Sequence, residues 1–357
     1  MRQRILITGA TGFLGRHLQE QLNGRGRADV VALVRDPDAW QAYGWTDDVS
    51  TAEIIEGALA DVPSLIEREA FGDLDVIYHL AGMVRHSRTR PEQQFRVNVD
   101  GTLEMVRLAA HTDARLVFVS TSGTVGCFPR SDMWADEHAP YCEETVANWP
   151  YYTSKIEAER QARQLADRRD VELVVVRPPM LWGPRDHRFR STGLLRSLLR
   201  ETLPAVPNGK VDFADVRDVA ALLVTLARKT HPRPVYHAPG TACRTDTLFE
   251  MVEAISDVDP PRTDVPTPLL WGLCEANRRW SDTLPLLPDA SDPVYIEMAA
   301  HFWESRSAYA HNELGYEARS PHQTLVDTFH WLRTVCPELD PPWADADDLR
   351  APLPIHP

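Results

Sequence analysis

The sequence predicts an α/β fold, in which a doubly wound parallel sheet carries a smaller, mostly helical C-terminal lobe. Through the first half of the chain, short apolar runs alternate with longer amphipathic stretches, as when parallel strands are joined by crossover helices. After Arg177 prolines recur and the alternation breaks up. We expect strands at residues 4–8, 29–34, 75–80, 115–120 and 171–177, and helices near 13–24, 62–70, 91–111 and 151–168.

The composition excludes several classes of function. The formal net charge of −14 leaves no basic surplus to neutralise phosphates, so we expect neither nucleic-acid binding nor membrane insertion. The five cysteines lie far apart without metal-ligand spacing, which predicts reduced thiols and no metal site. No apolar run approaches membrane-spanning length and none precedes the first predicted strand, a pattern typical of a cytoplasmic protein.

A glycine-rich loop follows the first predicted strand directly and leads into a predicted helix. Its sequence is Thr8-Gly9-Ala10-Thr11-Gly12-Phe13-Leu14-Gly15. Glycines permit a tight turn and let backbone amides approach a pyrophosphate, whose charge the helix N-terminus favours. The context of strand, turn and helix predicts a Rossmann-type dinucleotide site that uses Gly9, Thr11, Gly12, Phe13 and Leu14.

The change of composition after Arg177 predicts how the chain is divided. Residues 1–177 would form the dinucleotide-binding domain, joined by about 211–239, which resembles a strand, a helix and a strand that return to the sheet. Residues 178–210 and 240–335 would form the substrate-binding lobe. Residues 337–357, with many prolines and acids, are expected to be an extended tail.

The end of the second predicted strand bears on the choice of cofactor. It reads Val34-Arg35-Asp36-Pro37. An acidic residue at this place would bind the ribose hydroxyls of NAD, whereas a guanidinium suits the additional phosphate of NADP. Arg35 therefore favours NADP(H) over NAD(H), the alternative being a solvated arginine beside Asp36.

A tyrosine and a lysine lie four residues apart at the start of a predicted helix, in Tyr151-Tyr152-Thr153-Ser154-Lys155. Residues at this spacing share one helix face. An ammonium group beside a phenol stabilises the phenolate, which would lower the pKa of Tyr151 and let it exchange a proton with a substrate oxygen. Because the spacing is common by chance, the pair needs the support of other motifs.

Six motifs in order supply that support. They are the glycine-rich loop, His79-Leu80-Ala81-Gly82, Asn98-Val99-Asp100-Gly101-Thr102, Ser120-Thr121-Ser122, the Tyr151–Lys155 pair, and Arg177-Pro178-Pro179-Met180-Leu181-Trp182-Gly183-Pro184-Arg185-Asp186. With these motifs the sequence resembles the extended short-chain dehydrogenase/reductase family from Thr8 to about Leu332. Because of Val34-Arg35-Asp36-Pro37 and the late Leu314-Gly315-Tyr316, it looks most similar to the dihydroflavonol 4-reductase and 3β-hydroxysteroid dehydrogenase branch of that family.

The resemblance implies a role for each matching position. Tyr151 would be the general acid in carbonyl reduction, and Lys155 would lower its pKa and bind the nicotinamide ribose. Thr121 would hold the substrate oxygen, with Ser122 as the alternative. The other positions would contact the cofactor or brace its surroundings: Leu59, Leu80, Ala81, Gly82, Asn98, Ser120, Pro178 and Leu181.

The sequence departs from the family pattern beside the expected adenine. Relatives often carry an aspartate there, in a Gly-Asp-Leu motif, whereas this chain reads Gly57-Ala58-Leu59-Ala60-Asp61. Asp61 could replace that contact, or it could start the next helix as a cap.

Two features bear on the substrate. Sugar-nucleotide enzymes of the family commonly carry an arginine where this chain has Val211, which counts against a nucleotide-sugar substrate. Aromatic side chains suit a hydrophobic or aromatic ketone or aldehyde, unless they form the core of the lobe. Those in question are Trp134, Trp149, Trp182, Phe189, Trp271, Trp280 and Trp303.

Three functions follow in order of preference. The first is an NADP(H)-dependent oxidoreductase that reduces a ketone or aldehyde of a hydrophobic or aromatic substrate to an alcohol, or catalyses the reverse reaction. The second is a sugar or nucleotide-sugar epimerase or dehydratase that keeps NAD tightly bound. The third is an NADP-sensing binding protein without chemistry, which the intact Tyr151–Lys155 pair disfavours. Either a monomer or a homodimer is expected by analogy.

Overall fold

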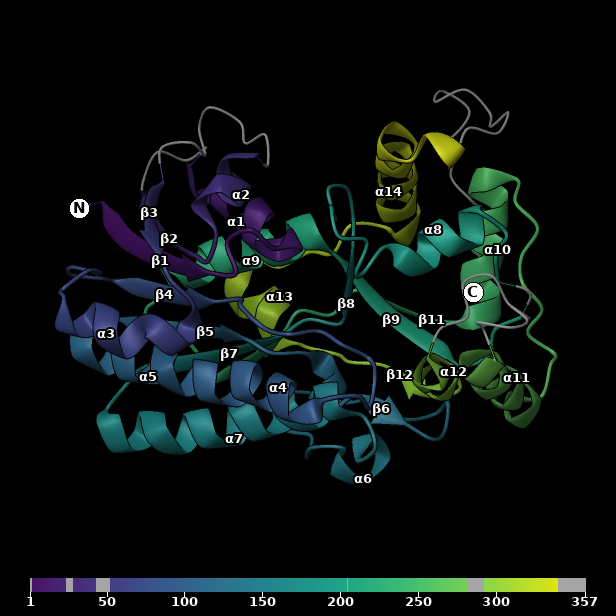
Figure 1. Cartoon of the computed structure of the whole chain (residues 1–357), viewed down its shortest axis with the longest axis horizontal. Helices are drawn as coiled ribbons and strands as arrows, with labels where there is room; N and C mark the ends of the chain where they lie inside the picture. The colour runs from purple at the N-terminus through teal and green to yellow at the C-terminus, as the bar shows by residue number, and fades with distance from the viewer. Residues whose placement is uncertain (1, 24–27, 43–51, 204, 281–291, 340–357) are drawn as a thin grey trace.

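The larger part of the molecule is a seven-stranded parallel sheet covered by helices on both faces (Figure 1). The computed structural model describes residues 2–23, 28–42, 52–203, 205–280 and 292–339. The strand order is β10-β7-β5-β4-β1-β2-β3. The strands are β1 (Gln3–Thr8), β2 (Ala28–Val34), β3 (Glu53–Glu56), β4 (Val76–His79), β5 (Arg115–Val119), β7 (Leu173–Arg177) and β10 (Val235–His237).

Side chains along each strand point alternately to the two faces of the sheet, and they form one hydrophobic core on each face. In β1, Ile5 and Ile7 pack into the core on one face, and Leu6 packs into the core on the other. The helices on the first face are α1 (Phe13–Asn23), α2 (Pro37–Ala42), α9 (Val216–Leu226) and α13 (Tyr309–Leu314). Those on the second face are α3 (Val62–Glu67), α4 (Pro91–Phe95), α5 (Gly101–Thr112) and α7 (Pro150–Arg169).

The expected α/β class is confirmed, and the five expected strands and four expected helices are present with small shifts of their ends. Residue 24, the expected end of the first helix, lies outside the described residues. The helix expected at 91–111 is interrupted by a π-helical turn, η2 (Arg96–Asp100), between α4 and α5. Strand β3, at the edge of the sheet beside β2, was not expected.

The C-terminal lobe contains a second sheet as well as helices. Its order is β11-β9-β12-β6, and β8 pairs with β9. Its strands are β6 (Cys127–Phe128), β8 (Met180–Trp182), β9 (Lys210–Asp215), β11 (Thr241–Arg244) and β12 (Phe302–Trp303). Within 211–239 the structure contains the expected strand, helix and strand, which are β9, α9 and β10. Of the two strands, only β10 joins the main sheet. Pairing with β11 and β8 holds β9 in the second sheet instead.

The remaining elements are short or belong to the lobe. The lobe helices are α8 (Gly193–Leu199), α10 (Thr245–Ser256), α11 (Thr267–Trp280), α12 (Pro293–Ala299) and α14 (Pro321–Val335). Short turns are η1 (Leu59–Asp61), η3 (Ser122–Thr124), α6 (Glu143–Val146) and η4 (Pro337–Leu339). Of the expected tail, η4 packs Leu339 into the lobe core, and residues 340–357 lie outside the described residues. Among the described helices, none combines the length and apolar character needed to span a bilayer.

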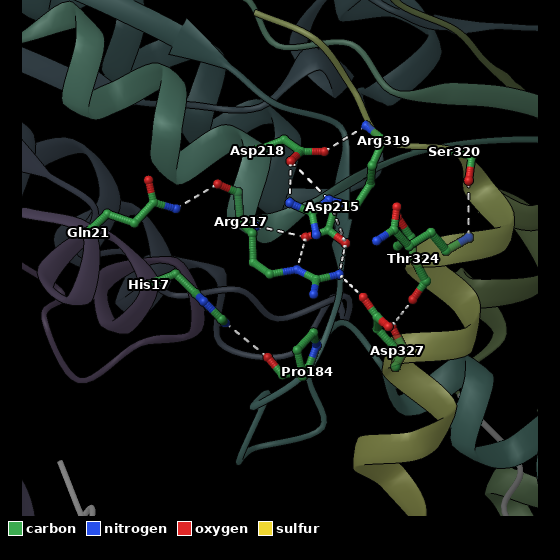
Figure 2. A network of polar contacts seen from close by, with 12 residues as sticks. His17, Gln21, Pro184, Asp215, Arg217, Asp218, Arg319, Ser320, Thr324 and Asp327 are labelled. Carbon is green, nitrogen blue, oxygen red and sulfur yellow. Dashed lines mark hydrogen bonds and ion pairs between the residues drawn. The ribbon is translucent and has the colours of Figure 1, made fainter. Parts of the chain in front are cut away.

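A network of ion pairs joins the two parts of the chain where β9 leads into α9 (Figure 2). The buried Asp215 carboxylate accepts three hydrogen bonds from Arg217, at 2.7–2.9 Å. Arg217 also pairs with Asp327 of α14 at 2.7 Å, and Arg319 pairs with Asp218. On the other side, His17 of α1 donates a 2.9 Å hydrogen bond to a carbonyl of the loop that follows β8. These contacts hold the lobe against the glycine-rich end of the main sheet.

Candidate active site

The glycine-rich loop turns tightly between β1 and α1, and its backbone leaves no room for side chains. Gly9 has φ +70°, and a Cβ atom there would lie 2.6 Å from the amide nitrogen of Ala81. A Cβ atom at Gly15 would lie 2.3 Å from the carbonyl oxygen of Gly9. The amide of Gly12 closes the turn by donating to that carbonyl at 2.8 Å. No acidic residue stands in the first turn of α1, so the helix N-terminus suits an anion.

The other loop residues predicted to bind the cofactor lie where this turn leads into α1. Phe13 and Leu14 are the first two residues of the helix, directly after Thr11 and Gly12. Leu14 is buried, and the ring of Phe13 packs edge-on against His17 at 5.7 Å between ring centroids. Backbone amides at the start of α1 can therefore serve as donors, which fits a pyrophosphate group.

His79 at the end of β4 connects the glycine-rich loop to the π-helical turn. The Thr8 hydroxyl accepts from the Ala81 amide and donates its own proton to His79 Nδ1 at 2.8 Å. On the other side, His79 Nε2 donates to the Thr102 hydroxyl at 3.0 Å, which in turn donates to the Asn98 carbonyl. Burial and the charge of Lys155 lower the pKa of His79 to about 3. The imidazole is therefore neutral, with its proton on Nε2.

Asn98 braces the segment after β4 against α7. Its side-chain oxygen accepts from the Met83 amide at 2.7 Å, and its side-chain nitrogen donates to the Met83 carbonyl at 3.1 Å. The same nitrogen donates to the Ser154 hydroxyl, which donates to the Tyr151 carbonyl. A Cβ atom added at Gly82 would lie 3.3 Å from Asn98 Oδ1. The structure thus gives the Asn98 amide a bracing role.

Tyr151 and Lys155 lie one turn apart at the start of α7, which begins at Pro150. The Lys155 ammonium donates to the Val119 carbonyl at 3.1 Å and lies 4.8 Å from the centroid of the Phe118 ring. A Cβ atom added at Gly82 would lie 3.5 Å from Lys155 Nζ. The lysine therefore reaches the loop that follows β4, as well as the end of β5.

The pKa values of the pair differ from the sequence-based expectation. Burial raises the pKa of Tyr151 to about 12, so the phenol is protonated near neutral pH. Burial lowers the pKa of Lys155 to about 8, and the nearby Glu159 carboxylate opposes this effect. The expected lowering of the Tyr151 pKa by Lys155 is absent from this structure, because desolvation of the phenol dominates. A neutral phenol can donate a proton.

One further turn along α7, Glu159 forms a buried ion pair that sequence reasoning did not single out. Arg177, at the end of β7, donates to both of its carboxylate oxygens, and Tyr141 donates to it at 3.1 Å. The two side chains are 0% and 4% exposed. Burial alone would raise the pKa of Glu159, but Arg177 outweighs it and holds that pKa below its usual range. The spacing of residues 151, 155 and 159 is the signal that could have revealed this carboxylate.

The segment after β5 places three hydroxyl side chains at the same edge of the sheet. Thr121 accepts a hydrogen bond from the Gly123 amide at 3.2 Å and caps the short helix η3. The Ser120 and Ser122 side chains are buried. The Ser122 amide donates to the Pro178 carbonyl at 2.8 Å, which ties this segment to the one that follows β7. Thr121 is the least buried of the three.

The predicted cofactor residues on β2, η1 and β8 lie near the same edge. Arg35 follows β2, is exposed, and has no ion pair among the described residues. The Leu59 side chain packs against Gly101, since a Cβ atom added at Gly101 would lie 2.5 Å from Leu59 Cδ1. Leu181 lies on β8, in register with Ala214 of β9. The Asp61 carboxylate accepts from the Ala58 amide at 2.8 Å, and α3 begins at the next residue, so Asp61 marks the helix start.

The aromatic residues proposed for the substrate differ in where they pack. Trp182 is fully buried, with its ring centroid 4.2 Å from that of Phe213, and Phe189 packs against Trp331. These two belong to the lobe core. Trp149 and Trp303 instead pack around Tyr152, while Trp271 donates to Glu297 of α12. Trp134 is exposed, and the Arg306 guanidinium lies over its ring, 4.7 Å from the ring centroid. The side chain of Trp280 lies outside the described residues.

The family assignment comes from a match that begins in β1 and ends in β10. Residues 5–237, more than half of the chain, match the model of the NAD dependent epimerase/dehydratase family. The chain belongs to this family. The extended short-chain dehydrogenase/reductase resemblance is thereby confirmed, and the protein is an NAD(P)-dependent enzyme of the oxidoreductase type.

Relatives within the epimerase/dehydratase family include several reductases. Cinnamoyl-CoA reductase 1 of Oryza sativa subsp. japonica is 29% identical over 271 residues, which cover 71% of this chain and 76% of that protein. Sterol demethylase protein B of Methylococcus capsulatus is 28% identical over 92% of this chain and 98% of its own length. Ceramide reductase of Caulobacter vibrioides is 31% identical, over 63% of this chain and 61% of that protein.

Solved structures of other proteins have the same architecture. The crystal structure of gox2253 is 25% identical, with a TM-score of 0.74, and the match covers 94% of this chain and 99% of that one. MoeE5, in complex with UDP-glucuronic acid and NAD, is 23% identical with a TM-score of 0.68, over 93% of this chain and 99% of that one. The second likeness shows the fold alone.

Proposed function

We propose that this protein is an NADP(H)-dependent oxidoreductase that reduces the ketone or aldehyde of a hydrophobic or aromatic substrate to an alcohol, or catalyses the reverse reaction. The observation that carries the proposal is the meeting of three segments at the carboxyl edge of the sheet. Tyr151 and Lys155 come from α7, Thr121 follows β5, and the Gly82 backbone, which follows β4, adjoins Lys155. Ligands of doubly wound sheets bind at this edge.

The side chains divide the chemistry as follows. A bound nicotinamide supplies or receives the hydride. Tyr151 donates its phenolic proton to the carbonyl oxygen as that oxygen gains negative charge, and Thr121 holds the same oxygen by a hydrogen bond. Lys155 would bind the nicotinamide ribose, and its pKa of about 8 leaves it mostly protonated at pH 7. The neutral His79 and Asn98 hold the loop that follows β4 in place, and this loop would contact the bound cofactor.

The environment of Val211 supports a reductase over a nucleotide-sugar epimerase. Val211 lies on β9, where an arginine would face the diphosphate of a sugar nucleotide, and it packs with the lobe core instead. The next residue, Asp212, is buried and accepts two hydrogen bonds from Ser305, at 2.7 and 2.9 Å. The relatives include cinnamoyl-CoA reductase 1, ketoreductase azaE and ceramide reductase, and these reductases support the same choice.

A substrate panel tests the proposal against its two alternatives. Aromatic, steroidal and β-keto compounds are added to the purified protein with NADPH, and loss of the dihydronicotinamide absorbance is followed. A reductase consumes NADPH in proportion to the alcohol formed. An epimerase carries its nucleotide through purification and consumes none, and a non-catalytic NADP-binding protein binds NADPH without turnover. Either of these two results would contradict the proposal.

The preference for NADP(H) rests on Arg35. We expect kcat/KM with NADPH to exceed that with NADH by at least about tenfold, because a charge-assisted bond to the additional phosphate is worth about 1.5–3 kcal/mol. Arg35→Asp should abolish or reverse this preference. Arg169→Asp, at the far end of α7, changes the net charge equally and should leave it intact. If the wild-type enzyme prefers NADH by about tenfold or more, Arg35 has been assigned wrongly.

The fit of the dinucleotide rests on Gly9. We expect Gly9→Ala to weaken NADPH binding by about tenfold or more, because the added methyl would meet the Ala81 amide at 2.6 Å in a left-handed backbone conformation. Gly193→Ala is the matched control, since a Cβ atom there meets nothing within 4 Å. Titration of intrinsic fluorescence with NADPH measures both. Equal affinity of the Gly9→Ala and wild-type proteins would place the pyrophosphate elsewhere.

A further inference from the structure

The segment after β4 holds a histidine ring against Tyr151. The ring centroid of His86 lies 5.2 Å from that of Tyr151, at an interplanar angle of 83°. It also stacks on Tyr152 at 5.9 Å and meets the edge of Tyr295 at 5.6 Å. Tyr295 belongs to α12 of the lobe, so His86 lies between the proposed proton donor and the substrate-binding part of the chain.

The backbone around His86 is held on both sides. Gln94, on α4, donates to the Met83 carbonyl at 3.0 Å and to the Arg85 carbonyl at 3.3 Å. After His86, Arg88 donates to the Asn148 carbonyl at 3.1 Å and pairs with Glu297 of α12. Because both flanks are tied to helices, the position of the imidazole is set by the fold rather than by its own packing alone.

One nitrogen of this imidazole is left without a partner. Among the described residues, nothing forms a hydrogen bond with the buried Nδ1 atom of His86. A buried polar atom in that state costs about 1–3 kcal/mol, and native proteins leave few of them. Burial also lowers the pKa of His86 to about 4, so near neutral pH the ring carries no charge. Such a nitrogen suits a neutral oxygen, either as donor or as acceptor.

We infer that His86 is a specificity-determining residue, which hydrogen-bonds through Nδ1 to a second, neutral oxygen of the substrate near the reacting carbonyl. This inference rests on the proposed function, because it requires a carbonyl held by Tyr151. Because the two rings are in contact, the second oxygen would lie close to the reacting carbonyl, as in β-keto and β-hydroxy carbonyl compounds. His86 forms and breaks no covalent bond; it selects among carbonyl substrates.

Pairs of substrates and three variants test this inference. Each β-keto or β-hydroxy carbonyl compound is paired with the same compound without the β oxygen, and kcat/KM is measured with NADPH for both. His86→Phe keeps an aromatic ring without a hydrogen bond. His86→Asn places an amide near the position of Nδ1, whereas His86→Gln places it near Nε2. The dissociation constant of NADPH and the thermal unfolding midpoint are measured for every variant.

We expect His86→Phe to lower kcat/KM for the β-oxygen compounds by about 10- to 100-fold relative to their partners, as for a lost hydrogen bond to a bound substrate. His86→Asn should restore part of this ratio, His86→Gln should not, and NADPH affinity should be unchanged. Equal losses for both members of each pair, or an Asn variant no better than Phe, would show a packing role and overturn the inference. Absence of NADPH consumption by the wild-type enzyme with every compound would overturn the proposed function itself.

Discussion

Tyr151→Phe should reduce turnover of carbonyl substrates by about 10²-fold or more while leaving NADPH affinity nearly intact. The substitution removes only the hydroxyl that donates the proton; the ring keeps its contacts with His86 and Tyr152. Steady-state kinetics with NADPH in excess, together with a separate titration of the cofactor, measure the two effects independently.

The neighbouring tyrosine provides the control for this prediction. Tyr152 lies on the same helix and is buried, but its ring packs toward Trp149 and Trp303, and among the described residues its hydroxyl makes no hydrogen bond. Tyr152→Phe should change turnover by less than about threefold. Similar losses of turnover in the two variants would contradict the assignment of the Tyr151 hydroxyl as the proton donor.

Arg177→Met should destabilise the protein by about 3–5 kcal/mol, because it leaves the Glu159 carboxylate buried without its cation. Glu159 is 0% exposed and receives Arg177 through both of its oxygens. Replacing both partners, by Arg177→Met with Glu159→Leu, should recover most of the loss, since no charge then stays buried. Denaturant unfolding at pH 7 measures the free energies of unfolding.

A second arginine beside Glu159 provides a control that tests whether the stabilisation depends on burial of the ion pair or on proximity of the charges alone. Arg163 lies 4.0 Å from the same carboxylate and is partly exposed. Arg163→Met should cost less than about 1 kcal/mol, as for other solvent-screened pairs. Because the pKa of Glu159 is lowered in the folded protein, the Arg177 contribution should be present above the ordinary carboxyl pKa and disappear as the pH falls through the folded value. A loss under about 1 kcal/mol for Arg177→Met would contradict this account.

Much of the main sheet could be predicted because its strands carry continuous apolar runs between helix patterns. The second sheet could not, since strands such as β6 and β12 are two residues long and pair only through tertiary contacts. Strand β3 was missed for a similar reason: Ile54 and Ile55 are its only apolar residues, between two glutamates. The register that places β9 outside the main sheet depends on β11 and β8, which lie far from each other in the sequence.

The candidate site shows the same division between local and tertiary information. Spacing along one helix predicts that Tyr151 and Lys155 share a face, and the glycine pattern predicts the turn between β1 and α1. The protonation of these groups depends on burial, which raises the pKa of Tyr151 instead of lowering it. His86 carries no local signal at all, because its contacts come from α7 and from α12.

A crystal structure of the complex with NADP⁺ tests the central claim most directly, because the proton donor and the hydride carrier must both reach the same substrate atoms. We predict that the Tyr151 and Thr121 hydroxyls will both lie within about 3 Å of one point beside nicotinamide C4, where a carbonyl oxygen can sit. We also predict that Lys155 Nζ will contact the nicotinamide ribose. A nicotinamide ring bound with the Tyr151 hydroxyl beyond hydrogen-bonding reach of every such point would contradict the proposed chemistry.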